Sequence, residues 1–377
     1  MKTPLAWHNL LHNKVRTTVA VVGVAFPLVL VFMQLGLYEA FLAGTTRLYE
    51  ALDFDLVLLS TEYVALGETR GFPRSRLAQT RAARGVQEAI PLYVGFYSWR
   101  NSDTQVLRKL FVIGSDPRRR VFRLPEVTAR LEALHIPHTV LIDRLTLPVF
   151  GPQHTGVVTE VNGHRITITG QYTLGLGFTA DGGIIVSDPT FAQLSGNSLG
   201  AEVHIGLVQL APEADTHAVG QELRRHLPND VEVLSRAELE ALEKRYWVQS
   251  TSVGIILGSG VLVGLLIEMI ILYQILSTEV ISRLPEYATL KDMGYSHGSL
   301  AWIVVQYAVL LGSGGYLSGF GVACALYKAI AEAIHLPVSM DFVRGVGVGM
   351  VTLMLCMGAS LLALRKVRLA DPAELFQ

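Results

Sequence analysis

Four apolar blocks constrain this chain more than any other feature of its sequence. They lie at roughly 18–43, 252–276, 299–327 and 343–364. Each is about as long as the ~20 helical residues needed to cross a hydrocarbon core about 30 Å thick. The first block is too long for the core of a signal peptide and lacks a small-residue cleavage site, so we expect it to be retained as an anchor. The sequence therefore predicts an α-helical membrane protein with four transmembrane helices.

Composition supports this prediction and excludes two classes of protein. Charged residues make up 17% of the 377 residues and hydrophobic residues 50%, whereas about a quarter of the residues of a soluble domain are charged. A simple soluble enzyme is therefore excluded. The formal net charge is only −1, so the chain lacks the basic field typical of nucleic-acid-binding proteins.

Basic residues near the ends of the blocks predict the orientation in the membrane. They precede the first block, separate the second from the third, and follow the fourth: Lys2, Lys14, Arg16, Arg283, Lys291, Arg365, Lys366 and Arg368. Because loops rich in Lys and Arg stay in the cytoplasm, both termini are expected there. The predicted organisation is a cytoplasmic amphipathic helix (1–16), transmembrane helices at 17–43, 252–276, 299–334 and 343–364, a domain at 44–251, a cytoplasmic loop helix (277–298), a short periplasmic loop (335–342) and a cytoplasmic tail (365–377).

The segment 44–251 is expected to be a large α+β extracytoplasmic domain, with two lobes. Strand-like runs lie at 54–59, 106–114, 154–161, 164–172 and 183–187, and helical patterns at 75–84, 216–227 and 235–247. Ser235 and Glu238 have the spacing of a capping box. Neither Pro nor Gly separates Trp247 from Ser252. The last helix of the domain is therefore expected to continue nearly unbroken into the second span.

Motifs for catalysis and nucleotide binding are absent or badly placed. The sequence contains no G-x-x-x-x-G-K-[ST] phosphate loop, so any ATP must be bound by a partner. The stretch 294–298 fits G-x-S-x-G but lies in a short loop between two predicted spans, not between a strand and a helix. His135 and His138 do not form a metal-ligand pattern. We therefore expect no catalytic residue, no bound cofactor and no metal in this chain.

Small and polar residues inside the spans predict how the helices associate. Pairs of glycines four residues apart let helix backbones approach closely; they are Gly254 and Gly258, Gly260 and Gly264, Gly315 and Gly319, and Gly345 and Gly349. Glu268 lies mid-span, where a charge costs at least about 2.5 kcal/mol and marks either a pathway or a protein interior. Gln34, Gln274 and Gln306 are read as hydrogen-bonding groups between helices.

Two amphipathic segments flank the spans on the predicted cytoplasmic side. Residues 5–16 place Leu5, Trp7, Leu10, Leu11 and Val15 along one stripe, which is typical of a helix lying on a membrane surface. The loop 283–295 resembles a short capped helix with Pro285 at its start and Gly294 at its end. Such a helix suits insertion into a groove of a partner protein. The contact residues expected there are Glu286, Tyr287, Leu290, Lys291, Met293 and Gly294.

The order of these segments resembles the FtsX/MacB-type ABC transporter permeases, and is closest to the DevC family. The resemblance rests on the opening AWHNLLHNKVRT, on external stretches such as FVIGSDPRRRVFRLPEV and ADGGIIVSDPTF, on the loop EYATLKDMGY and on the tail RKVRLADPAELF. The tripeptide Arg283-Leu284-Pro285 departs from the polar residues expected before that loop. The resemblance implies a MacB-like external domain and a homodimer in the bacterial inner membrane.

It also implies partners and a mechanism. These are a cytoplasmic ABC ATPase that holds ATP and Mg, a HlyD-type membrane-fusion adaptor and, indirectly, a TolC-like outer-membrane channel. Motion driven by ATP would pass through the membrane by mechanotransmission and drive efflux of a glycolipid or other amphiphile. Three alternatives remain open: a lipoprotein-releasing permease, an FtsX-like non-transporting regulator of a cell-wall hydrolase, and a membrane-anchored enzyme.

Overall fold

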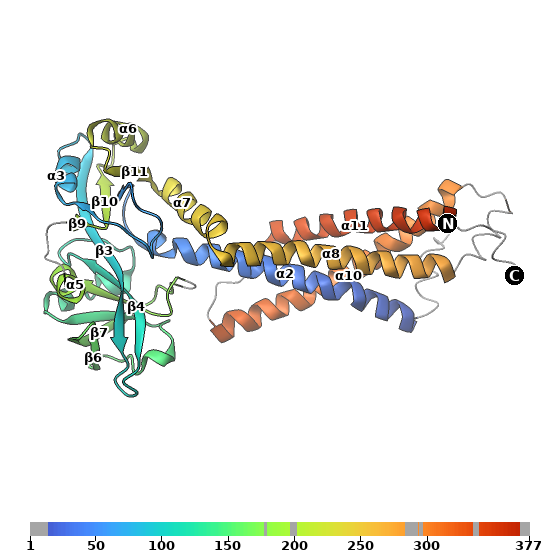
Figure 1. Ribbon diagram of the computed structural model, residues 1–377, viewed down its shortest axis with the longest axis horizontal. Coiled ribbons are helices and arrows are strands. Elements are labelled where there is room, and N and C mark those ends of the chain that lie inside the picture. Colours follow the sequence, from blue (N-terminus) through green and yellow to red (C-terminus); the bar gives the residue numbers. More distant parts are fainter. Residues whose placement is uncertain are drawn as a thin grey trace. The chain divides into compact units, whose positions relative to one another are not determined.

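The computed structural model describes residues 14–176, 179–196, 202–282, 293, 297–334 and 339–369. It divides into two compact units, one of Met1–Ala40 with Ser252–Gln377 and one of Phe41–Thr251. The first consists of long helices and the second of strands and short helices (Figure 1). The predicted fold class, four apolar helices with an α+β domain between the first and the second, is confirmed.

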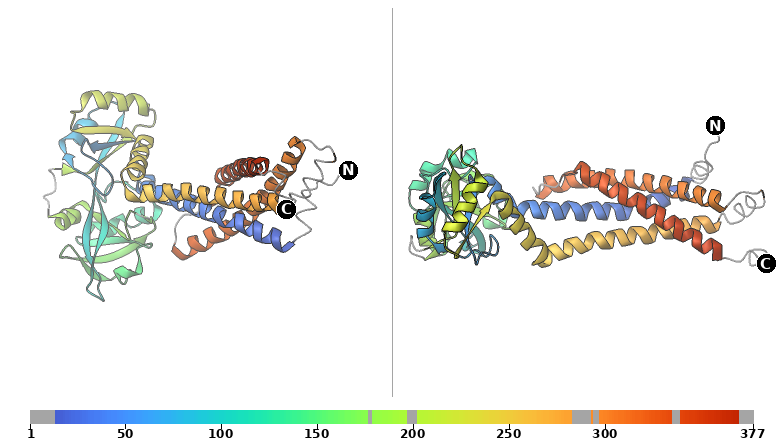
Figure 2. Two further views of the ribbon diagram at one scale, coloured as in Figure 1. Left: turned by 45° about the vertical axis from the view of Figure 1, so that its right-hand side comes forward. Right: turned by 90° about the horizontal axis from the view of Figure 1, so that it is seen from above.

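Four long helices account for the first of these units, which we call the membrane unit (Figure 2). They are α2 (Lys14–Ala51), α8 (Ser252–Ser282), α10 (His297–Ile334) and α11 (Phe342–Leu369). Each contains a stretch that is long and apolar enough to cross a membrane. Their shared core includes Val24, Leu28 and Phe32 of α2 together with Leu272 of α8 and Leu311 of α10. Many outward apolar side chains are exposed, such as Phe26 and Ile256, as expected where lipid is the solvent.

A nine-stranded sheet organises the domain, in the order β11-β1-β10-β3-β4-β8-β5-β7-β6. Only the pairs β4–β8 and β5–β7 are parallel. The strands are β1 (Leu56–Ser60), β3 (Val86–Arg100), β4 (Leu107–Ser115), β5 (Thr139–Asp143), β6 (Val158–Val161), β7 (His164–Tyr172), β8 (Gly183–Ser187), β10 (Ile205–Leu210) and β11 (Val231–Ser235). A separate two-stranded sheet pairs β2 (Phe72–Pro73) with β9 (Glu202–Val203).

Both faces of the large sheet are buried. Along β1, Leu56 and Leu58 belong to one apolar cluster, whereas Val57 and Leu59 belong to another. Since successive side chains of a strand point to opposite faces, each face has its own core. Short helices accompany the strands: α3 (Ser75–Arg81), α4 (Pro125–Thr128), α5 (Asp188–Ser195), α6 (Thr216–His226), α7 (Arg236–Gln249) and the 3-10 turns η1 (Leu131–His135) and η2 (Pro148–Phe150).

Because both faces of the sheet are buried, some of its strands could be predicted from the sequence and others could not. The predicted strands 164–172 and 183–187 have the bounds of β7 and β8, and the predicted strand 154–161 is shortened to β6. The longest strand, β3, was not predicted. Its middle residues are buried without alternation, so it lacks the period-two pattern by which a half-exposed strand is recognised.

The domain's last helix, α7, confirms one local prediction and corrects another. Ser235 and Glu238 form the predicted capping box. The helix does not continue into the second span, however. It ends at Gln249, and α8 begins at Ser252. Ser250 closes the last turn by donating its N–H to the Tyr246 carbonyl, and the Thr251 hydroxyl donates to the Trp247 carbonyl at 2.6 Å. Helix α7 thus ends without any Pro or Gly, and these bonds satisfy carbonyls of its last turn.

Candidate functional site

Most of the residues predicted to contact a partner ATPase lie outside the described part of the chain. These are Glu286, Tyr287, Leu290, Lys291 and Gly294. Met293 is described and is 64% exposed. The contact role of this loop stays a prediction.

The structure places most of the predicted packing glycines against a neighbouring helix. A Cβ atom at Gly315 would lie 2.5 Å from Val24 Cγ1, and one at Gly319 would lie 3.1 Å from the Ala25 carbonyl oxygen. These two glycines therefore bring α10 against the backbone of α2. On α8, a Cβ at Gly264 would lie 2.8 Å from Val31, so that helix also approaches α2 closely.

The remaining glycines divide into two groups. On α11, Gly345 faces the Phe320 ring and Gly349 the Tyr316 ring of α10, and Gly260 of α8 faces the Gln34 side chain. Gly254 is buried. Gly258, in contrast, has no neighbour within 4 Å, so nothing in the described chain requires a glycine at that position.

Two close contacts were missed because their glycines do not follow the four-residue spacing. Gly36 of α2 lies against the Tyr327 ring, and Gly312 of α10 lies against the Cys356 sulfur. The Tyr327 hydroxyl donates a hydrogen bond to the Phe32 carbonyl. Since an isolated glycine has no spacing to recognise, only the packed helices reveal these contacts.

The three predicted intramembrane polar residues occupy different surroundings. Glu268 is fully buried, and among the described residues neither carboxyl oxygen has a partner that meets hydrogen-bond geometry. The Thr352 hydroxyl of α11 lies close enough to interact with it and is likewise buried without such a partner in the described chain. The Gln34 carbonyl oxygen is buried without a partner, whereas Gln274 is exposed.

Ion pairs connect α2 to other helices near both ends of the membrane unit. At one end, Arg16 Nη2 lies 3.0 Å from Glu279 Oε2 of α8 and donates to the Ser282 hydroxyl at 3.1 Å. At the other end, Glu39 pairs with Arg344 of α11. From residue 16 to residue 39, α2 rises about 35 Å at ~1.5 Å per residue. The two ion pairs are thus separated by slightly more than a hydrocarbon core of about 30 Å.

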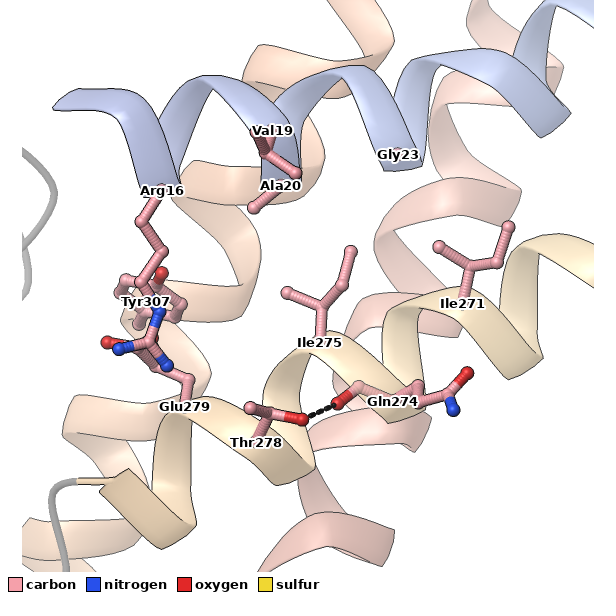
Figure 3. A pocket seen from close by; sticks show the side chains of 10 residues that line it. All are labelled: Arg16, Val19, Ala20, Gly23, Ile271, Gln274, Ile275, Thr278, Glu279 and Tyr307. Carbon is pink, nitrogen blue, oxygen red and sulfur yellow. Dashed lines mark hydrogen bonds and ion pairs between the residues drawn. The ribbon is translucent and has the colours of Figure 1, made fainter. Parts of the chain in front are cut away.

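A groove of about 380 Å³ lies next to the first of these ion pairs, between α2, α8 and α10 (Figure 3). Arg16 and Glu279 lie at one end, and Gly23 and Ile271 at the other. The full lining is Arg16, Val19, Ala20, Gly23, Ile271, Gln274, Ile275, Thr278, Glu279 and Tyr307. The Thr278 hydroxyl is satisfied by the Gln274 carbonyl at 2.8 Å, and Figure 3 shows the Gln274 amide directed away from the ion pair.

Within the domain, Arg236 joins the start of α7 to the end of α2. Its guanidinium donates to the carbonyls of Tyr49, Leu52 and Phe54 and lies 4.0 Å above the Phe54 ring. A helix leaves its last carbonyls without intrahelical partners and carries partial negative charge at that end. Arg236 supplies both donors and positive charge there.

Glu243, two turns further along α7, makes a second connection to the same region. Its Oε1 accepts hydrogen bonds from the Tyr49 hydroxyl at 2.8 Å, from the Tyr63 hydroxyl and from the Leu66 N–H at 3.0 Å. Burial raises the pKa of this carboxyl, and the hydrogen bonds from Tyr63, Tyr49 and Leu66 partly oppose that rise. We call Arg236 and Glu243, with the groups they bind, the α2–α7 clasp. No feature of the sequence indicated it.

These features describe a protein with four long apolar helices that pack through glycines, and an α+β domain in which the end of α2 is clasped to α7. Residues 258–372 match the family described as FtsX-like permease C-terminal. The matched part of the chain contains most of α8 and all of α10 and α11. No curated protein matches the chain.

Solved structures show only distant similarity. The extracellular domain of the noncanonic ABC-type transporter YknZ from Gram-positive bacteria is 12% identical, with a TM-score of 0.35; 48% of this chain and 99% of that one are covered. The periplasmic region of MacB from Actinobacillus actinomycetemcomitans is 10% identical, with a TM-score of 0.36 and coverage of 52% and 94%. Scores this low do not establish a common fold.

Proposed function

We propose that this chain is the permease subunit of an ATP-driven ABC exporter in a bacterial inner membrane, with both termini in the cytoplasm. A partner ATPase binds ATP and Mg, and this chain binds neither. The exporter is a homodimeric, DevC-like assembly that expels a glycolipid or other amphiphile with a membrane-fusion adaptor and an outer-membrane channel. The match of residues 258–372 to FtsX-like permeases supports the permease role.

The α2–α7 clasp is the observation that carries the proposed mechanism. Helix α2 runs from Lys14 to Ala51 without a break, so its last turns belong to the domain. Arg236 and Glu243 hold those turns against α7. Only Ser250 and Thr251 separate α7 from α8. A displacement of α8 relative to α2 would therefore act on α7 through this short connection, and the clasp resists separation of α7 from the end of α2.

In this mechanism the ATPase acts on the loop after α8. When its two nucleotide-binding subunits close, they push on residues 286–294, and the push moves α8. Among the described residues of the membrane helices, the ion pairs Arg16–Glu279 and Glu39–Arg344 lie near the helix ends, and each has one exposed member. A mechanical role needs no hydrophilic path across the bilayer. The domain then changes shape and drives the amphiphile toward the adaptor.

The test reverses charge on the proposed contact helix with Glu286→Lys and Lys291→Glu together. We expect at least a tenfold loss of both ATPase co-purification and export, measured in membranes that contain equal amounts of permease. Glu222→Lys with Arg225→Glu is the matched control, since both residues are exposed on α6. Unchanged ATPase association in the first variant would show that the coupling helix is wrongly assigned.

A further inference from the structure

The groove beside the Arg16–Glu279 ion pair has the dimensions and lining of a ligand site. Its volume of about 380 Å³ lies within the ~300–1,000 Å³ typical of small-molecule pockets. Small residues on α2 create the space, because Ala20 and Gly23 face Ile271 and Ile275 of α8. A Cβ at Gly23 would already lie 3.4 Å from Ile275 Cδ1. A larger side chain at position 23 would therefore fill the groove.

The two ends of the groove differ in chemistry. Around Gly23 and Ile271 the walls are apolar, whereas the other end holds Arg16 and Glu279 (Figure 3). Gly23 lies seven positions after Arg16, which is about 10 Å along α2. A molecule that fills the groove must thus have a polar group at one end and at least 10 Å of hydrocarbon beyond it.

The charges at the polar end select the sign of that group. The Arg16 side chain is 45% exposed, whereas that of Glu279 is 7% exposed, so an incoming group meets the guanidinium first. A guanidinium offers five N–H donors in a planar fork and can hold a carboxylate and a phosphate together. Lys14, in the first turn of α2, is also exposed and adds positive charge.

We propose that this groove binds a phospholipid from the leaflet that faces the Arg16 end of the helices. Its phosphate pairs with Arg16, while Glu279 and Ser282 hold the guanidinium in place. One acyl chain follows Ala20 and Gly23 between α2 and α8. Water does not fill an apolar cavity, and an empty groove would leave its lining side chains without contacts. An acyl chain from the surrounding bilayer fills the apolar part of the groove and supplies those contacts.

The first test asks where a lipid tail lies. The full chain is reconstituted into phosphatidylcholine vesicles that contain phosphatidylglycerol with a photoreactive diazirine midway along one acyl chain. We expect crosslinks on the peptides containing Gly23 and Ile275, and at least a fivefold loss of these crosslinks in Gly23→Leu. Gly258→Leu is the matched control, because that glycine has no neighbour within 4 Å; its crosslinks should equal those of the unmodified chain.

The second test asks what holds the headgroup, and it does not depend on whether the Gly23 variant folds. Arg16→Gln with Glu279→Gln removes the ion pair without leaving a buried charge unpaired. The photoreactive phosphatidylglycerol should crosslink the original chain about tenfold more than a diacylglycerol with the same chain, and the double variant should lose this preference. Such a tenfold preference corresponds to about 1.4 kcal/mol.

Three results would overturn the proposal. One is crosslinking of exposed residues such as Ile255 and Leu262 at the same yield as the groove, which would indicate surface lipid only. Another is unchanged groove crosslinking in Gly23→Leu. The third is a disulfide that forms between a Val19→Cys copy and a Gln274→Cys copy of the chain and abolishes crosslinking of the photoreactive lipid. This result would assign the groove to a second copy of the chain. Export and ATPase association enter none of these readouts, so the proposed function can fail separately.

Discussion

Two buried glutamates, one in the domain and one in the membrane unit, differ in the hydrogen bonds that their carboxyl groups accept. Glu243 in the domain and Glu268 in the membrane unit are both fully buried. Glu243 accepts three hydrogen bonds, from Tyr49, Tyr63 and Leu66. Neither carboxyl oxygen of Glu268 has a partner. The Glu243 carboxyl thus joins α2 and α7 of the domain, whereas the Glu268 carboxyl makes no hydrogen bond that meets the usual geometry among the described residues of the membrane unit.

The difference shows that the two units are stabilised by different contacts. The domain has an apolar core on each face of its sheet, and its clasp gives one carboxyl oxygen of Glu243 three specific donors. In the membrane, burial from water gives no drive for helices to associate, so close packing must supply it. Glycines such as Gly315 and Gly264 provide that close approach. Substitutions that remove a hydrogen-bonding partner should therefore harm the domain most, and those that add volume should harm the membrane unit most.

The largest effect is expected for Glu243→Ala. It leaves the Leu66 N–H and one of the two tyrosine hydroxyls without an acceptor at a buried site, since the hydroxyls can still bond to each other. Each unsatisfied donor costs about 1–3 kcal/mol. We expect the free energy of unfolding to fall by roughly 3–5 kcal/mol, measured by denaturation of the full chain in detergent. Glu222→Ala, at an exposed position on α6, should change it by less than about 0.5 kcal/mol. A similarly small effect at Glu243 would mean that the clasp does not hold α2 to α7.

The next prediction concerns Asp188, a carboxyl of the domain that resembles Glu268. Its Oδ1 is buried without a partner, and burial, with a smaller contribution from Asp116, raises its pKa from 3.8 to about 7. Because the folded state binds this proton more tightly than the unfolded state, the contribution of Asp188 to stability is greatest below pH ~4 and is lost as the pH rises to about 7.

The loss across this window is at most about 4 kcal/mol, since one pKa unit corresponds to ~1.4 kcal/mol. Denaturation of the original chain at several pH values should show this decline, and Asp188→Asn should remove most of it. An equal decline in Asp188→Asn would assign the pH dependence to other groups.

Adding volume in the membrane unit should have a smaller effect than removing the acceptor in the clasp. At Gly315 a new Cβ would lie 2.5 Å from Val24, so Gly315→Ala should destabilise the helix bundle by about 1–3 kcal/mol. Gly258→Ala has open space around it and should be neutral or stabilise the helix by up to about 1 kcal/mol. Thermal unfolding in detergent compares the two; equal melting temperatures would show that the contact between α2 and α10 is not tight.

The smallest effect is expected for Glu268→Leu. Replacing a buried polar group that lacks partners with an apolar residue of similar volume is often neutral or stabilising. We expect a change within about 1 kcal/mol, in contrast to Glu243→Leu, which should lose several kcal/mol. The same unfolding measurements decide this. A large loss at Glu268 would reveal that its carboxyl has a stabilising partner, and the contrast between the two units would then fail.

Local signals explain which parts of the fold could be predicted. Long apolar runs identified the four membrane helices, and the Ser235–Glu238 spacing identified the capping box at the start of α7. Both depend on residues close together in the chain. The end of α7 at Gln249 could not be predicted, because neither Pro nor Gly marks it in the sequence. The strand β3 was missed because burial on both faces removes its alternation.

The candidate sites depend on contacts between distant residues. Glycine spacing directed attention to Gly315 and Gly319, yet it also included Gly258, which faces open space, and omitted Gly36, which contacts Tyr327. A spacing shows which residues share a helix face but not which face meets another helix. Likewise, nothing local distinguishes Glu279, the partner of Arg16, from any other acid near a span.

The sequence alone determined that this chain has four lipid-length helices with a mixed α+β domain after the first, because hydrophobic length and periodicity act within short windows. Only the tertiary structure decided how those parts are joined. Arg236 and Glu243 bind groups almost 200 positions away in the chain, and the groove at Arg16 exists because α2 and α8 bring small residues opposite larger ones. Partners so distant in sequence leave no local pattern, since only folding makes them neighbours.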